Sequence, residues 1–91
     1  MHLLITYDLK APGKDYAPLI NMIKTIGSGT WAHIQDSVWY VKTSLTPDEV
    51  VRRLRICTDV NDILFVAEIS RSASRNLPHQ VQSHLSQMRL P

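Results

Sequence analysis

The 91-residue sequence predicts an α+β sandwich of the ferredoxin-like kind, with elements in the order βαββαβ and a short C-terminal helix. Residues 2–7 are rich in strand-forming residues and apolar on both faces, which is typical of a central strand buried on both sides, and residues 63–69 form a second strongly apolar strand. Residues 16–26 and 47–56 carry apolar side chains at helical spacing, and a hairpin lies between these two helices. Right-handed crossovers then give a four-stranded antiparallel sheet with both helices on one face and the first and third strands in the centre.

Length and composition indicate one small domain that lies outside the membrane. The apolar fraction is 44%, which is ordinary for a globular chain. No window approaches the roughly 18 uninterrupted apolar residues of a membrane span, and the start lacks the basic leader of a secretory signal. The single cysteine, Cys57, has no internal disulfide partner, so we expect a cytoplasmic protein.

Positive charge is concentrated at the C-terminal end. Residues 1–70, the expected ferredoxin-like domain, contain seven Lys or Arg and eight Asp or Glu, a net charge of −1. Residues 71–91, expected to be a basic linker and an amphipathic helix, contain three arginines and no acid. The whole chain has a net charge of only +2, so it is not a strongly basic protein.

The first strand ends at Asp8, and a loop through Lys10 and Lys14 follows it. Asp15 is the expected N-cap of the first helix, and Pro18 falls in its first turn. Gly27 is expected to end this helix as a left-handed cap.

The hairpin is predicted to join strands at 30–34 and 37–43 through a tight turn at Gln35 and Asp36. The next helix has the clearest local pattern. Thr46 and Glu49 have the spacing of a capping box, Pro47 stands at the first helical position, and Leu45 and Val50 have the spacing of a hydrophobic staple.

The sheet face turned away from the two helices remains partly apolar. On the first strand one alternating set is Leu3, Ile5 and Tyr7, and the other runs from His2 to Asp8 and includes Leu4. Monomers rarely leave such a patch open, so we expect a symmetric dimer or a cover by the tail. A stripe at helical spacing predicts a helix at 78–88 that docks on its own domain or on a partner, and it consists of Leu77, Val81, Leu85 and Met88.

Asp8 is the first candidate site residue because it stands where a central strand emerges. A carboxylate there suits Mg²⁺, and a nearby two-fold axis would let two copies of Asp8 share one ion. The alternative is that Asp8 only opens the following loop. Asp36 and Ser37 would add an acceptor and a hydroxyl, or serve simply as turn residues.

A second candidate site is basic. Arg52, Arg53 and Arg55 form one helix face, and together with Arg71 and Arg75 they would bind phosphates in a salt-dependent way. The alternative is a solvated helix face. Trp31 and Trp39 either stack on bases or pack the hairpin.

The segments Leu3–Leu9 and Ile34–Trp39 resemble the Cas-two family, the small subunit of the CRISPR spacer-acquisition machinery. Its members begin with an apolar strand ending in Tyr-Asp and carry a Gln-x-Ser-Val-aromatic pattern on the hairpin. The resemblance covers residues 2–69. Residues 14–16 and 45–47 are more similar to SinR-like relatives outside CRISPR loci, and the virulence-associated protein D toxins are further relatives.

The resemblance implies a homodimer through sheet faces that contacts nucleic acid, DNA or RNA. Some members are described as metal-dependent nucleases. By this resemblance, Asp8 would be the Mg²⁺ ligand and Ser37 would be the hairpin serine of the catalytic site. Where many members carry arginines, this chain has only Lys10 and Lys14 as phosphate-binding candidates. The alternative function is a non-catalytic dimeric interaction or regulatory module, with the C-terminal helix as a contact for a protein partner.

Overall fold

A computed structural model describes residues 1–10 and 16–88 of the chain. Lys14 and Asp15, both expected to have roles, lie outside the described residues. The elements are β1 (His2–Asp8), α1 (Ala17–Ile26), β2 (Trp31–Gln35), β3 (Val38–Lys42), α2 (Pro47–Arg55), β4 (Ile63–Glu68) and α3 (His79–Met88). Within the described ranges, no helix is both long enough and apolar enough to cross a membrane.

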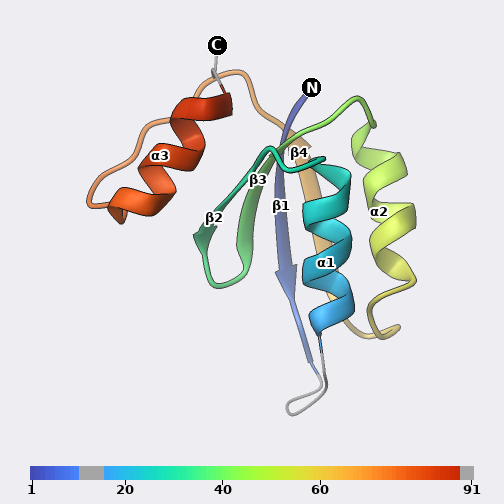
Figure 1. Cartoon of the computed structure of the whole chain (residues 1–91). Helices are drawn as coiled ribbons and strands as arrows, with labels where there is room; N and C mark the ends of the chain where they lie inside the picture. The colour runs from blue at the N-terminus through green and yellow to red at the C-terminus, as the bar shows by residue number, and fades with distance from the viewer. Residues whose placement is uncertain (11–15, 89–91) are drawn as a thin grey trace.

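The four strands form one antiparallel sheet in the order β2-β3-β1-β4, so β1 and β3 are central, as predicted. Figure 1 shows α1 and α2 side by side on one side of this sheet and α3 on the other side, next to β2. This is the predicted α+β arrangement with a C-terminal helix. The edges of the sheet are β2 and β4.

The main core lies between the sheet and the first two helices. Leu3 and Ile5 of β1 are fully buried there, together with Leu19 and Ile23 of α1 and Leu54 of α2. Removing each of these side chains from water stabilises the fold by about 1.5–3 kcal/mol. The alternation predicted for β1 therefore assigns the helix-covered face correctly.

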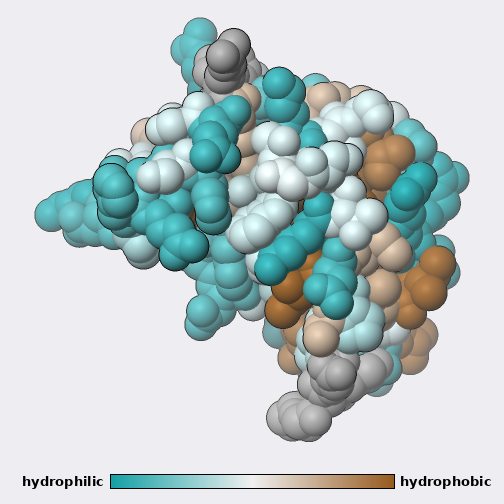
Figure 2. All heavy atoms as spheres, viewed as in Figure 1, coloured by the Kyte–Doolittle hydropathy of each residue, from teal (hydrophilic) through white to brown (hydrophobic). Residues whose placement is uncertain are grey.

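The opposite sheet face is only half covered. There α3 buries Ala32 and Tyr40 of the hairpin beneath Met88, with Val81 and Leu85 packed alongside. The tail thus docks on its own domain, which is one of the two predicted arrangements. Hydrophilic side chains cover the outward side of this helix (Figure 2), as its amphipathic pattern requires.

The β4 half of that face remains open. Ile63 and Phe65 are 53% and 64% exposed, although both are large apolar residues in a strand. The expected uncovered apolar surface is therefore present but smaller than the whole face, because α3 covers the β2 half.

The helix α1 ends at Ile26 as predicted, but its two caps differ from the expectation. Tyr16 is the N-cap, and its side chain makes no capping hydrogen bond. Gly27 has right-handed dihedrals (φ −76°, ψ −7°), so the prediction of a left-handed cap at this residue was wrong. The Gly27 N–H still donates to the Ile23 carbonyl, and the left-handed residues are the next two, Ser28 and Gly29.

Gly27 is required for a different reason. A Cβ atom at this position would lie 2.9 Å from the Thr30 carbonyl oxygen, which is closer than two such atoms can approach. The chain reverses tightly here, since the Thr30 N–H donates to the Gly27 carbonyl at 2.7 Å. The glycine therefore permits a close backbone approach, not an unusual φ.

The hairpin turn is Asp36–Ser37, one residue later than predicted. A bulge between His33 and Gln35 changes the register, so Gln35 pairs with Val38 and β2 extends through Gln35. Such an extra residue in one strand depends on how the two strands pair, which the sequence of one strand does not show.

The start of α2 follows the prediction. The Glu49 N–H donates to Thr46 Oγ1 at 3.3 Å, and the Thr46 N–H donates to Glu49 Oε1 at 3.2 Å. Pro47 occupies the first turn, and Leu45 packs against the core cluster that contains Val50. All of these contacts are local, which is why the sequence pattern identified them.

Candidate functional site

Asp8 is the last residue of β1 and lies at one end of the sheet, opposite Ile63 on β4. Its side chain is 60% exposed, and its Oδ2 atom lies 2.5 Å from Lys10 Nζ. An ion pair this exposed adds little to stability, but it places a cation directly on the candidate metal ligand. Lys10 is therefore a partner of Asp8 as well as a candidate for phosphate binding.

The hairpin turn is fastened to the same end of the sheet. The Tyr7 N–H donates to the Ser37 carbonyl at 3.2 Å, and the Tyr7 hydroxyl donates to the Asp36 carbonyl at 3.2 Å. The structure therefore brings Ser37 next to the residue that precedes Asp8. The sequence analysis did not predict a role for the Tyr7 hydroxyl, which also accepts a hydrogen bond from Trp39 Nε1 at 3.0 Å.

Asp62 is the next acid at this end, and it serves the local fold. Its carboxylate accepts hydrogen bonds from the Lys10 N–H at 2.8 Å and the Asp59 N–H at 2.7 Å. The Tyr16 hydroxyl donates to the same carboxylate at 3.3 Å. These contacts connect the start of the loop after β1 to the turn before β4.

One protomer does not fit a Mg²⁺ ion well. Mg²⁺ prefers oxygen ligands in octahedral geometry and usually takes one or two carboxylates with water and substrate phosphates. Among the residues that the structure describes, no group of three or more His, Cys, Asp or Glu side chains is placed to hold a metal. Asp8 alone, already paired with Lys10, is an incomplete site.

The candidate arginines fall into two separate sets. Arg52, Arg53 and Arg55 are exposed on α2, which covers the main-core face of the sheet. Arg71 and Arg75 are exposed in the segment between β4 and α3. Part of that segment, Ser72 to Ser74, borders a hollow over the opposite sheet face, beside Leu4 and Tyr40. The structure therefore does not bring the two sets together.

The α2 arginines have acids close by. The pKa of Glu49 is lowered by the backbone hydrogen bond from Thr46, by the Thr46 hydroxyl, and by the charges of Arg52 and Arg53. Arg55 borders a hollow that Asp59 and Asp62 also line. These acids weaken the attraction of α2 for phosphate groups.

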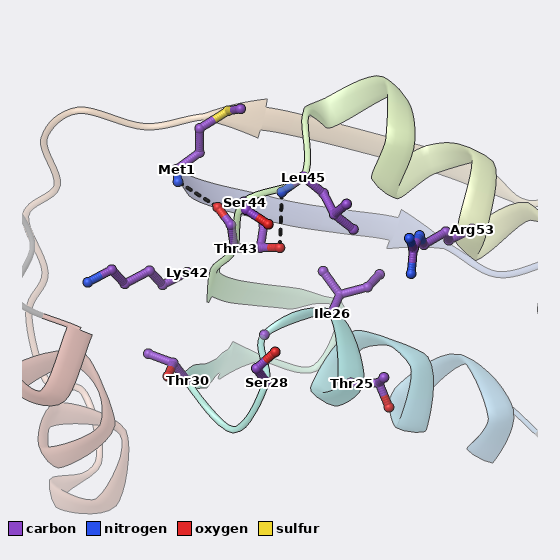
Figure 3. Close-up of a pocket in the computed structure, with 11 residues that line it drawn as sticks. Met1, Thr25, Ile26, Ser28, Thr30, Lys42, Thr43, Ser44, Leu45 and Arg53 are labelled. Carbon is purple, nitrogen blue, oxygen red and sulfur yellow. Dashed lines mark hydrogen bonds between the residues drawn. The ribbon is translucent and has the colours of Figure 1, made fainter.

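A hollow of about 650 Å³, with a mixed polar and apolar lining, lies where the end of α1 meets the end of β3. Figure 3 shows its two side-chain cations, Lys42 and Arg53, at opposite ends, with the Thr43 segment between them. The Thr43 hydroxyl accepts a hydrogen bond from the Leu45 N–H at 3.2 Å, so it supports the chain before α2. Because its two side-chain cations lie at opposite ends, they do not converge on one phosphate, and this hollow is a weak candidate for a phosphate site.

A scan against models of protein families finds no match for this chain, and a search of curated proteins finds none either. The resemblance to the Cas-two family thus rests on the strand and hairpin motifs alone.

Proposed function

We propose that this chain forms a homodimer that binds nucleic acid, as its resemblance to the Cas-two family implies, and that Mg²⁺-dependent cleavage uses Asp8 of both copies. The observation that supports this most is that Asp8 shares a sheet face with the exposed apolar residues Ile63 and Phe65. On β1 and β4, Asp8 pairs with Ile63 and Thr6 pairs with Phe65, and paired residues lie on the same face of a sheet.

A second copy is the simplest cover for this open surface. Phe65 is 64% exposed on an edge strand, and large apolar side chains on such strands favour association. A two-fold contact uses the same patch on both partners, so an axis near Ile63 would place two Asp8 side chains close together.

Two facing carboxylates repel one another unless cations lie between them. Lys10 supplies one such cation in each copy. The two Asp8 carboxylates would hold Mg²⁺ in place of the Lys10 cations, and the bound ion would neutralise charge on a phosphodiester. Ser37, at the same end of the sheet, would offer a hydroxyl for positioning the phosphate.

The ion pair between Asp8 and Lys10 favours a second candidate, a non-catalytic dimeric module. If Lys10 keeps Asp8 neutralised, the dimer binds nucleic acid through its cations and needs no metal. A role for the C-terminal helix in capturing a protein partner has less support, since its apolar stripe already packs on its own sheet.

Oligomeric state tests the first step. Phe65→Glu would place a charge in the contact, so we expect light scattering to give a monomer for this variant and a dimer for the wild type. Val60→Glu is the matched control, because Val60 is 98% exposed but lies in the turn before β4. A monomeric wild type would contradict the proposal.

Cleavage tests the second step. We expect Mg²⁺-dependent cleavage of a mixed set of DNA and RNA substrates to disappear in Asp8→Asn and to persist in Asp48→Asn, an exposed acid on α2. Salt-sensitive binding without cleavage would establish the second candidate. The absence of any binding would overturn both.

A further inference from the structure

We infer that the groove between the hairpin and α3 is a stacking site for one unpaired nucleotide of a single strand. This inference rests on the proposed nucleic-acid binding and adds to it the place and the form of the ligand. The groove has a volume of about 340 Å³, near the lower end of the range for small-ligand sites. Three aromatic side chains of the hairpin, Trp31, His33 and Trp39, line one wall, and α3 forms the other.

The first stacking surface is the imidazole ring of His33. It lies parallel to the Trp39 ring, with centroids 3.9 Å apart and an angle of 8° between the planes. Two hydrogen bonds fix this pair: Trp39 Nε1 donates to the Tyr7 hydroxyl, and His33 Nε2 lies 3.2 Å from the Asp36 carbonyl oxygen. Trp39 is buried and His33 half-buried, so the imidazole forms the accessible layer of a rigid stack.

The second surface is the indole ring of Trp31. It contacts the edge of His84 on α3 at 5.0 Å and lies tilted against Trp39 at 5.4 Å, between ring centroids. Trp31 is half-buried, and its indole N–H has no hydrogen-bond partner among the residues that the structure describes. It can therefore donate to a base edge or a sugar oxygen at the groove.

Lys24 gives the groove its charge. Its Nζ atom lies 4.8 Å from the centre of the Trp31 ring, at the distance of a cation–π contact. No acid is among the described residues that line the groove. An aromatic surface with one cation beside it suits a planar base attached to a phosphate. Duplex bases are stacked on one another and cannot enter such a groove, so the ligand is a single strand.

The competing explanation is that these rings only fasten α3 to the sheet edge. The two explanations differ in two properties taken together. A base that enters the groove changes tryptophan emission and makes strand binding depend on Lys24, whereas with a purely structural cluster strand binding does not depend on Lys24. The chain contains two tryptophans, and both line the groove, so tryptophan emission reports on the surroundings of this site.

The experiment titrates the full chain with an oligothymidylate of about ten nucleotides, a length within the range that small single-strand sites cover. We expect the strand to quench tryptophan emission, and a duplex of matched length to leave it unchanged. Lys24→Gln and Trp31→Leu are each expected to weaken strand binding about tenfold or more. Lys42→Gln is the matched control, because Lys42 is also an exposed lysine but lies outside the groove.

The possible results separate this inference from the proposed function. Suppose that binding is salt-sensitive, that tryptophan emission does not change, and that Lys24→Gln binds like the wild type. This result would contradict the stacking site in the groove and leave the proposed function standing. Failure to bind any strand or duplex would overturn both. Thymidine monophosphate that binds as tightly as the strand would overturn the assignment to a strand. Since Trp31→Leu removes part of the packing against α3, the Lys24 variant and the wild-type quenching decide the result if that variant misfolds.

Discussion

Asp62 and Glu49 illustrate how single carboxylates hold this fold together. Each accepts a backbone N–H group, from Lys10 and Asp59 in the first case and from Thr46 in the second. The role of Glu49 follows from its spacing to Thr46 along the chain. The contact of Asp62 with Asp59 is local, but its contact with Lys10 joins residues 52 positions apart, which local sequence does not reveal.

The capping box gives the first prediction. Thr46→Ala should lower the free energy of unfolding by about 1 kcal/mol, because the Glu49 N–H loses its acceptor. Urea denaturation measures this, with Ser70→Ala, at an exposed linker residue, as the control. An unchanged midpoint in Thr46→Ala would contradict the role of this cap.

Glu49 adds a pH dependence to the same helix end. Its folded pKa is lowered by the Thr46 hydrogen bonds, so its contribution is complete above the ordinary value of 4.5 and is lost as the pH falls through the folded pKa. We expect Glu49→Gln to lose less stability than the wild type between neutral and acid pH. Equal losses in paired urea titrations would rule out this contribution.

His2 gives a prediction for proton binding. Burial lowers its pKa from 6.5, and the charge of Lys42, its cross-strand partner, lowers it further. The neutral form therefore stabilises the fold above 6.5, and this contribution is lost as the pH falls below that value. An NMR titration should show a midpoint below 6.5 that rises in Lys42→Gln and stays unchanged in Lys24→Gln.

The helices and strands differ in how far their own residues determine where they begin and end. The start of α2 was predictable to the residue, since the cap, the proline and the staple all lie within one turn. The hairpin turn and the conformation of Gly27 were not, although α1 ends at Ile26 as predicted. A bulge fixes the turn, and the close approach of Gly27 to Thr30 fixes the conformation of Gly27. Both depend on contacts between different segments of the chain, which the residues of one element do not show.

The candidate sites divide in the same way. Topology was enough to place Asp8 at an end of the sheet, and the structure adds that Ser37 lies at that same end and that Lys10 pairs with Asp8. Trp31 and Trp39 were stacking candidates from the sequence, but the groove that they line was not predictable, because it exists only where α3 crosses the β2 edge. Nothing in the spacing of Trp31 and His84 indicates that their rings meet.

The docking of α3 gives a prediction at the level of the element. Met88, the last residue of α3, is fully buried against Ala32 and Tyr40, so Met88→Asp should release α3 while the main core stays folded. Hydrogen exchange should then lose protection at residues 79–88 and keep it on β1. Ser83→Asp, on the exposed side of α3, should change neither. Global unfolding of Met88→Asp would instead show that the tail is part of one cooperative core.

Over the whole molecule, the sheet separates two basic surfaces with different surroundings. The arginines on α2 share their side with Asp48 and Glu49, and Arg55 borders the hollow of Asp59 and Asp62. The segment at 70–76 carries Arg71 and Arg75, is exposed throughout and contains no acid. Its positive potential should therefore extend further toward an approaching phosphate backbone.

This difference gives the last prediction, which rests on the proposed nucleic-acid binding. Replacing both Arg71 and Arg75 with Gln should make the binding less sensitive to salt. The negative slope of log affinity against log salt should shrink in magnitude by about two, one for each phosphate that the variant no longer neutralises. The matched double variant on α2, Arg52→Gln with Arg55→Gln, removes the same charge and should change the slope less, because the neighbouring acids already offset it. Binding measured by fluorescence anisotropy over a range of salt concentrations gives both slopes. A larger effect of the α2 variant would place the nucleic acid on the helix-covered side of the sheet, away from the open face and the segment that leads to α3.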